Sequence, residues 1–492
     1  MSLLTPILIA PLLAGLLCLV VPSRRVMVAL GVLAFATTLA LGIALLHEVL
    51  ARGVVTEWNG FLCADALSAW MVLLVSVVSF ASALYAGPYF QRDIEAGMVS
   101  PARVREFYVL TPLFGAGMFM VVLANNLGVM WAAVEGTALS SVLLVALYNR
   151  RHSLEAAWKY VMLGSVGLAL ALLGTVFVYA AACKNAPDAV PSLNWSYLMS
   201  VAGGLDPHLL KLAFVFAFVG YGTKAGLAPM HTWLPDAHSE APSPTSAMLS
   251  GVSLKIALYA LLRFHILTAA CLDSAFSRRL LLVFGLLSML LAPPFILVQR
   301  NLKRLLAYSS LEHIGLICTA IGLNTPLTIL GALMHMGYHA LTKPVLFFAA
   351  GNIHQAFHAL EFRRIGSGVA KVLPLTALWM GLAALAAIGL PPFGLFLSEL
   401  TVLSGGLAAH ETTVSALILI ALVASFCGIL QQFTRILLGT RRPDARPIET
   451  HRLDGAPAMI LLLGALLLFS VWLPEPLLDL LRQAAAIIGG QP

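Results

Sequence analysis

Titratable side chains lie inside stretches of this chain that are otherwise apolar. Glu135, for example, ends the run Val-Met-Trp-Ala-Ala-Val-Glu. An ionisable side chain in the middle of a bilayer costs at least ~2.5–3.5 kcal/mol, so it normally faces a protein interior, with a partner or water. We expect proton transfer from these residues: Glu135, Lys224, Lys255, His335, His339, Lys343 and Glu399, with Glu312 and His313 as further relay candidates.

Two apolar stretches, 208–234 and 373–406, are interrupted by glycine and proline, and each carries an ionisable residue near the interruption. The first interruption covers 220–226, contains Lys224 and is followed by a proline; the second covers 389–394 and precedes Glu399. A bilayer offers no water to freed backbone groups, so a broken helix persists there only where protein or a wet cavity surrounds it. Paired breaks of this kind indicate an ion or substrate path in a transporter.

The spacing of the titratable residues predicts how they cooperate. His335, His339 and Lys343 recur every four residues, which places them on one face of a helix. A buried lysine loses its proton more easily, and a nearby carboxylate restores the charged form, so Glu135 beside Lys224 can load and release a proton. We expect Lys255 to be the central carrier and the histidines to relay protons towards Glu399.

Each of these residues also has a structural interpretation. Lys224, Lys255 and Glu399 could form structural ion pairs or reach the membrane surface. The histidines and Glu312 could equally make helix–helix hydrogen bonds. A cluster of His231, Asp236, His238 and Glu240 could bind a metal, although a gate or a loop clamp is the preferred interpretation. Arg263 and Arg435 are expected to extend from the ends of their spans to the membrane surface.

Composition identifies the elements that must position these residues. The 492-residue chain is 60% hydrophobic and 10% charged, whereas soluble domains are about 25% charged, so an all-α integral membrane protein without strands is predicted. Fourteen stretches are long enough to cross a bilayer. They are 3–22, 26–48, 62–86, 107–124, 127–149, 155–183, 208–230, 243–268, 278–299, 302–323, 327–355, 373–405, 411–440 and 455–473. The first has no basic segment before it, so a cleaved signal peptide is not expected.

The net charge of +7 reports topology rather than nucleic-acid binding, because the basic residues gather in alternate loops. The loop that follows span thirteen, for example, contains Arg441, Arg442, Arg446 and Arg452. The rule that cytoplasmic loops are basic then predicts a multi-pass protein of the cell's inner membrane with both termini away from the cytoplasm. The six cysteines are scattered singly, so neither a metal nor a redox cofactor is expected in this chain.

An internal repeat is suggested by two equal spacings. Glu135 and Glu312 are 177 residues apart, and Lys224 and Glu399 are 175 apart. If spans four to eight and nine to thirteen are two units, their odd number of helices inverts the second unit in the membrane. The predicted division is 1–106 for the first three spans, 107–268 and 278–440 for the two five-helix repeats, and 441–492 for the last span and a short amphipathic tail.

Longer motifs resemble the antiporter-like subunits of respiratory complex I and membrane-bound hydrogenases, most strongly over 107–400. Segment 224–238 reads Lys-Ala-Gly-Leu-Ala-Pro-Met-His-Thr-Trp-Leu-Pro-Asp-Ala-His, and segment 301–310 reads Asn-Leu-Lys-Arg-Leu-Leu-Ala-Tyr-Ser-Ser. The resemblance assigns Glu135, Lys224, Lys255 and Glu399 to the family's ionisable positions in spans five, seven, eight and twelve, and His339 and Lys343 to its polar positions in span eleven. Segments 239–244, 310–315 and 361–366 look like the hydrogenase-4 component F branch.

The resemblance implies a proton-translocating subunit that carries out no redox chemistry itself. Its implied partners are other antiporter-like and membrane subunits, iron–sulfur and nickel–iron subunits of a hydrophilic arm, and the lipid bilayer. Two alternatives remain: Na⁺/H⁺ exchange in a multisubunit cation antiporter, and a passive membrane anchor for the hydrophilic arm.

Overall fold

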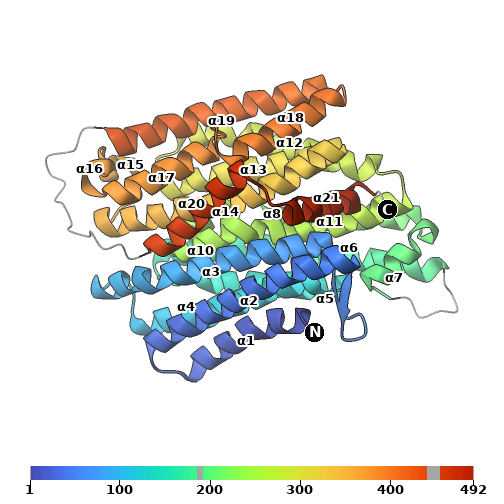
Figure 1. Ribbon diagram of the computed structural model, residues 1–492, viewed down its shortest axis with the longest axis horizontal. Helices are drawn as coiled ribbons and strands as arrows, with labels where there is room; N and C mark the ends of the chain where they lie inside the picture. The colour runs from blue at the N-terminus through green and yellow to red at the C-terminus, as the bar shows by residue number, and fades with distance from the viewer. Residues whose placement is uncertain (1, 186–191, 440–454, 491–492) are drawn as a thin grey trace.

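The computed structural model describes residues 2–185, 192–439 and 455–490. Long helices lie side by side in one bundle, with the first helices at one flank and α19 at the other (Figure 1). The basic residues expected between 441 and 452, and the start of the predicted unit 441–492, lie outside the described residues.

The helices of the bundle have the following bounds: α1 Leu4–Val20, α2 Arg24–Arg52, α3 Ala66–Glu95, α4 Pro101–Leu123, α5 Leu127–Val145, α6 Arg151–Asn185, α7 Trp195–Ser200, α8 Pro207–Ala225, α9 Trp233–Glu240, α10 Ser243–Met248, α11 Leu254–Cys271, α12 Ala275–Val298, α13 Leu302–Leu323, α14 Pro326–Phe357, α15 Phe362–Ile365, α16 Val369–Val372, α17 Pro374–Ala387, α18 Gly394–Ala408, α19 Thr412–Leu438, α20 Ala456–Val471 and α21 Glu475–Gly489. A short 3₁₀ turn, η1, covers Ala202–Gly204, and a π-helical segment, η2, covers Leu249–Ser253.

Membrane crossing is supported by length and composition. Among the described residues, nine helices are long and apolar enough to cross a bilayer, or ten if α20 and α21, which are bent by 80° relative to each other, form one span. Three shorter apolar helices correspond to two further predicted spans: α1 to 3–22, and α17 with α18 to the interrupted span 373–405. The prediction of a multi-pass helical membrane protein is confirmed at this level.

The prediction that the protein has no strands is wrong. Strands β1 (Val55–Glu57) and β2 (Leu62–Ala64) form an antiparallel hairpin between α2 and α3. Its turn contains Trp58, Asn59 and Gly60, all with positive φ. At three residues each, the strands are too short to show the alternation of side chains that identifies a strand in a sequence.

The hairpin holds the first helix in place through Glu57. Its carboxylate accepts hydrogen bonds from the backbone N–H groups of Leu4 and Thr5, at 2.9 and 3.0 Å, and from the hydroxyl of Ser2 at 2.8 Å. These backbone donors have no partner within α1 because they belong to its first turn. Burial raises the pKa of Glu57, but the hydrogen bonds from Thr5, Leu4 and Ser2 outweigh it and lower the pKa to about 2.

Both predicted breaks are present. The first separates α8 from α9, and it begins at Gly226, whose left-handed conformation (φ 79°) ends α8. Residues 220–225 are therefore still helical, and Lys224 lies in the last turn of α8. The second break separates α17 from α18, and Glu399 lies after it in α18. The two ionisable residues thus lie on opposite sides of their breaks.

Glycines allow close contact in two helix pairs, α6 with α8 and α12 with α13. A Cβ atom added to Gly174 of α6 would lie 2.7 Å from the carbonyl oxygen of Ala213 in α8. One added to Gly285 of α12 would lie 2.6 Å from the backbone nitrogen of Thr319 in α13. The glycines allow these two helix pairs to approach closely, as small residues do in membrane bundles.

The predicted amphipathic tail is α21. Its buried face consists of Leu480, Leu481, Ala484, Ala485 and Ile488. The start of α1 and the end of α21 both lie towards the end of the bundle that carries the hairpin, whereas α15 and α16 lie at the opposite end (Figure 1).

Candidate functional site

Lys255 lies at the point where η2 changes into α11, and it is completely buried. Its ammonium nitrogen (Nζ) donates to the carbonyl oxygens of Ser250, at 3.3 Å, and Gly251, and it lies 2.8 Å from Nδ1 of His339. The wider π turn changes the backbone pairing just before this residue, and such turns occur frequently at functional sites. The backbone thus supplies polar ligands to a cation that has left water.

A row of imidazoles continues from Lys255 towards α18. The ring centroids of His339 and His313 are 4.9 Å apart, and Nδ1 of His313 lies 2.9 Å from Nε2 of His335. On its other side, Nδ1 of His335 lies 2.9 Å from the hydroxyl of Ser398, the residue before Glu399. Both nitrogens of His335 are therefore engaged, one on each side. This is the geometry by which an imidazole accepts a proton on one nitrogen and releases one from the other.

Lys343, one turn beyond His339 on α14, is also completely buried. Its ammonium nitrogen donates to the hydroxyl of Ser309 at 2.7 Å and to the carbonyl oxygen of Leu306 at 3.2 Å, both on α13. Glu312 lies one turn further along α13 and interacts electrostatically with Lys343. The structure therefore brings Glu312 and Lys343 into the same buried polar region as the histidines.

Lys224 has a partner that the sequence analysis did not identify. Its ammonium group donates to the hydroxyl of Tyr160 in α6 and lies 4.6 Å from the centre of that ring. The same hydroxyl is 2.8 Å from the hydroxyl of Ser141 in α5. Tyrosine gave no signal in the sequence, because an amphipathic ring is common in any membrane helix.

Glu135 lies within electrostatic range of Lys224 but makes no direct ion pair with it among the described contacts. One of its carboxylate oxygens is buried and has no hydrogen-bond partner within residues 2–185, 192–439 and 455–490. The expected direct contact is therefore replaced by a looser arrangement, in which Tyr160 is the direct ligand of the lysine.

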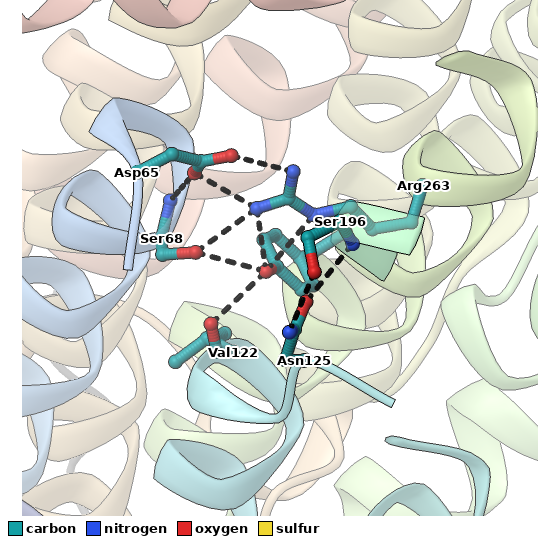
Figure 2. A network of polar contacts seen from close by, with 7 residues as sticks. Asp65, Ser68, Val122, Asn125, Ser196 and Arg263 are labelled. Carbon is teal, nitrogen blue, oxygen red and sulfur yellow. Dashed lines mark hydrogen bonds and ion pairs between the residues drawn. The ribbon is translucent and has the colours of Figure 1, made fainter. Parts of the chain in front are cut away.

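The expectation for Arg263 was wrong. Only 5% of this residue is exposed, and its guanidinium makes two hydrogen bonds with the carboxylate of Asp65, at 2.6 and 2.8 Å (Figure 2). It also donates to the hydroxyls of Ser68 and Tyr259. Its place near the end of the predicted span 243–268 suggested the membrane surface, but Arg263 lies in the middle of α11, and its partner Asp65 is 198 residues away in the sequence. Arg435, in contrast, is exposed as expected.

Potential metal ligands gather at two places in the described part of the chain. Within the described ranges, a single group of at least three potential ligands lies close together: His313, His335 and Glu399, with ligand atoms within 4.8 Å of one another. In the loop cluster, Asp236 instead pairs with Lys159 at 3.1 Å and with Arg304, so a clamp between helices describes it better.

The chain is similar to known proteins over most of its length. The model of the family described as "NADH:quinone oxidoreductase/Mrp antiporter, TM" matches residues 124–426. The chain is 36% identical to the hydrogenase-4 component F homolog of Methylacidiphilum infernorum over 430 residues, which cover 87% of this chain and 89% of that protein. It is 32% identical to NADH-quinone oxidoreductase subunit N of Desulforudis audaxviator over 432 residues, 87% of this chain and 82% of that one.

Solved structures share the fold. A chain of the membrane-bound sulfane sulfur reductase, an archaeal respiratory membrane complex, superimposes with a TM-score of 0.85 at 24% identity, over 99% of this chain and 96% of that one. A chain of the Mrp complex from Dietzia sp. DQ12-45-1b gives a TM-score of 0.84 at 22% identity, over 99% and 97%. At such identities the likeness extends to the fold alone.

Proposed function

This chain belongs to the NADH:quinone oxidoreductase/Mrp antiporter family, as an antiporter-like membrane subunit of the complex I and membrane-bound hydrogenase type, and we propose that it moves protons along its buried row. The observation that carries the proposal is the contact series from Lys255 through His339, His313 and His335 to Ser398. A carboxylate oxygen of Glu399 lies within 4.8 Å of ring nitrogens of His313 and His335. Lys224 with Glu135, and Lys343 with Glu312, would load and discharge this row.

The proposed subunit holds no redox centre. Electron transfer would take place in iron–sulfur and nickel–iron partner subunits, and other antiporter-like subunits would lie beside this chain in the cytoplasmic membrane. Support comes from the relatives, which are named as components of hydrogenase-4 and of NADH-quinone oxidoreductase. The energy of that reaction would arrive as an electrostatic or conformational push on the row.

The proposed topology has fourteen spans, with both termini away from the cytoplasm. Residues 1–106 would form the first three spans, 107–268 and 278–440 two inverted five-helix repeats, and 441–492 the last span and tail. The two broken spans, one in each proposed repeat, support this division.

The test uses the complete complex in proteoliposomes. A potassium-diffusion potential is imposed, and proton uptake is read from a trapped pH dye. Lys224→Ala and Glu399→Ala should each abolish proton uptake while the complex remains assembled, whereas Arg435→Ala, which changes an exposed residue, should not. Wild-type proton uptake in assembled Lys224→Ala and Glu399→Ala complexes would favour the passive-anchor interpretation instead.

Na⁺/H⁺ exchange is the second candidate, because the fold is equally close to a chain of an Mrp complex. The same vesicles prepared with and without Na⁺ distinguish the two functions. Proton uptake that is unchanged when Na⁺ is absent would reject exchange, and uptake that requires Na⁺ would reject the primary proposal.

A further inference from the structure

We propose that a cavity between the ends of α3, α14 and α17 is the mouth through which protons reach Lys343, and that Asp93 is the acid that collects them. The cavity has a volume of about 250 Å³, and its lining includes Asp93, Asn352, Gln355, His358 and Thr376. It lies at the end of the bundle opposite the β hairpin, where α15 and α16 follow α14 (Figure 1). The inference rests on the proposed proton transfer and adds its uptake route.

Asp93 has the position and partners of a proton-collecting group. Its residue surface is completely buried from bulk solvent, yet the residue lines the cavity. The carboxylate accepts a hydrogen bond from the hydroxyl of Tyr148 at 2.6 Å and another from the side-chain amide of Gln355 at 2.7 Å. Hydroxyl and amide donors orient a carboxylate without removing its capacity to bind a proton.

A hydrogen-bonded chain leads inward from this acid. The hydroxyl of Tyr148 lies 2.7 Å from that of Tyr89, and Tyr89 in turn lies against Ser243 at the start of α10. Ser243 also faces Gly351 of α14, where an added Cβ would lie 2.6 Å from the serine hydroxyl. The absence of a side chain at Gly351 thus allows α10 to lie directly against α14.

Buried polar atoms on α9 and α10 have no hydrogen-bond partner among the residues that the structure describes. They are the hydroxyls of Ser243 and Thr245 and both ring nitrogens of His238. Such atoms are normally satisfied by ordered water. His238 stacks on Phe347, one turn from Lys343, and interacts electrostatically with that lysine. The polar atoms therefore extend from the cavity to the buried row.

The proposed transfer is a series of proton hops from Asp93 through Tyr148 to Tyr89, in which the number of protons is conserved. A hydronium ion in the cavity gives a proton to the Asp93 carboxylate and is left as a water molecule. The acid then gives this proton to the oxygen of Tyr148, while Tyr148 passes its own hydroxyl proton to Tyr89 and onward. Each hydroxyl is neutral before and after the step, Asp93 is again ionised, and one proton has moved towards Lys343.

The experiment compares variants of the complete complex in proteoliposomes under an imposed potassium-diffusion potential. Asp93→Asn keeps the shape of the side chain but cannot bind the proton, and Tyr148→Phe removes only the hydroxyl. Both should slow proton uptake by about 10²- to 10⁴-fold, the range typical for the loss of one positioned proton-transfer group. Asp93→Glu should recover most of the rate. Glu106→Gln, which alters an exposed carboxylate on α4, is the matched control and should match the wild type.

Two further variants separate failure of the route from failure of the proposed function. Lys343→Ala and Lys224→Ala test the buried row itself. If they abolish uptake while Asp93→Asn and Tyr148→Phe run at the wild-type rate, the route is overturned and the function stands. If all four transport normally, both fail. A rate for Asp93→Glu as low as that for Asp93→Asn would show that packing matters rather than the acid, and would also overturn the inference.

Discussion

Removal of the Arg263 guanidinium should destabilise the protein far more than removal of an exposed arginine. Arg263 and Asp65 are both buried, and their two hydrogen bonds are 2.6 and 2.8 Å long. The pair joins the start of α3 to α11, the helix that also carries Lys255, so it connects the N-terminal helices to the candidate site. The substitution Arg263→Met keeps much of the apolar stem but leaves the carboxylate of Asp65 without its counter-charge.

The magnitude follows from the contacts that remain. After Arg263→Met, Asp65 still accepts the backbone N–H of Ser68 at 2.9 Å, but no other cation is among its described partners. Breaking a buried ion pair from one side typically costs about 3–5 kcal/mol, whereas replacing both partners is often close to neutral. We therefore expect the double variant Asp65→Asn/Arg263→Met to be more stable than Arg263→Met alone, although the hydrogen bonds with Ser68 and Tyr259 are also lost.

The assay is the rate of unfolding of the purified complex in mild detergent at a fixed temperature, with Arg435→Met as the exposed control. Unfolding of Arg263→Met should be the fastest, the double variant intermediate, and the control equal to the wild type. If Arg263→Met and Arg435→Met unfold at the same rate, the pair contributes nothing and the reasoning from burial is refuted. If the double variant is the least stable, the hydrogen-bond network outweighs the charge pair.

Three further outcomes are expected. Tyr160→Phe removes the hydroxyl that binds Lys224 and should slow proton uptake by roughly tenfold or more in the vesicle assay, with assembly unchanged. Glu57→Gln should cost about 1 kcal/mol at pH 7, as for other helix caps. The hydrogen bonds lower the pKa of Glu57 in the folded protein to about 2, whereas its pKa in the unfolded chain is about 4.3. The contribution of Glu57 to stability is therefore complete above about pH 4.3 and disappears as the pH falls towards 2. The unfolding rates of Glu57→Gln and the wild type should accordingly converge in acid. Gly351→Ala should destabilise by about 1–3 kcal/mol through overpacking, whereas Gly464→Ala, with no atom within 4 Å of the new Cβ, should be neutral or slightly stabilising in the same measurement.

The residues of the buried row could be selected from the sequence because each violates a strong rule. A histidine or lysine in an apolar helix must find polar neighbours, and helical spacing already places His335, His339 and Lys343 on one face. The contacts of Lys255 with His339, and of His335 with Ser398, follow from that requirement. Their role in proton transfer remains a prediction.

What the sequence could not reveal depends on pairings that leave no local pattern. The π-helical segment at 249–253 reads Leu-Ser-Gly-Val-Ser, and no residue pattern in it distinguishes a π turn from an α turn, so its carbonyl ligands for Lys255 could not be expected. The hydroxyl partners of the lysines, Tyr160 and Ser309, come from other helices. Asp65 could not be matched to Arg263 because only the folded bundle brings together the start of α3 and the middle of α11.

The composition of the row explains why an external push could move protons through it. None of the ion pairs found in the described part of the chain includes Lys255 or Lys343; both lysines are held by carbonyl, hydroxyl and imidazole groups. A positive charge on one member is therefore not cancelled by a contacting carboxylate and acts on its neighbours. Two unit charges roughly 6 Å apart repel by about 3 kcal/mol at an effective dielectric constant of 20, which corresponds to a change of about a hundredfold in proton affinity. Loading one end of the row would thus favour release at the next member.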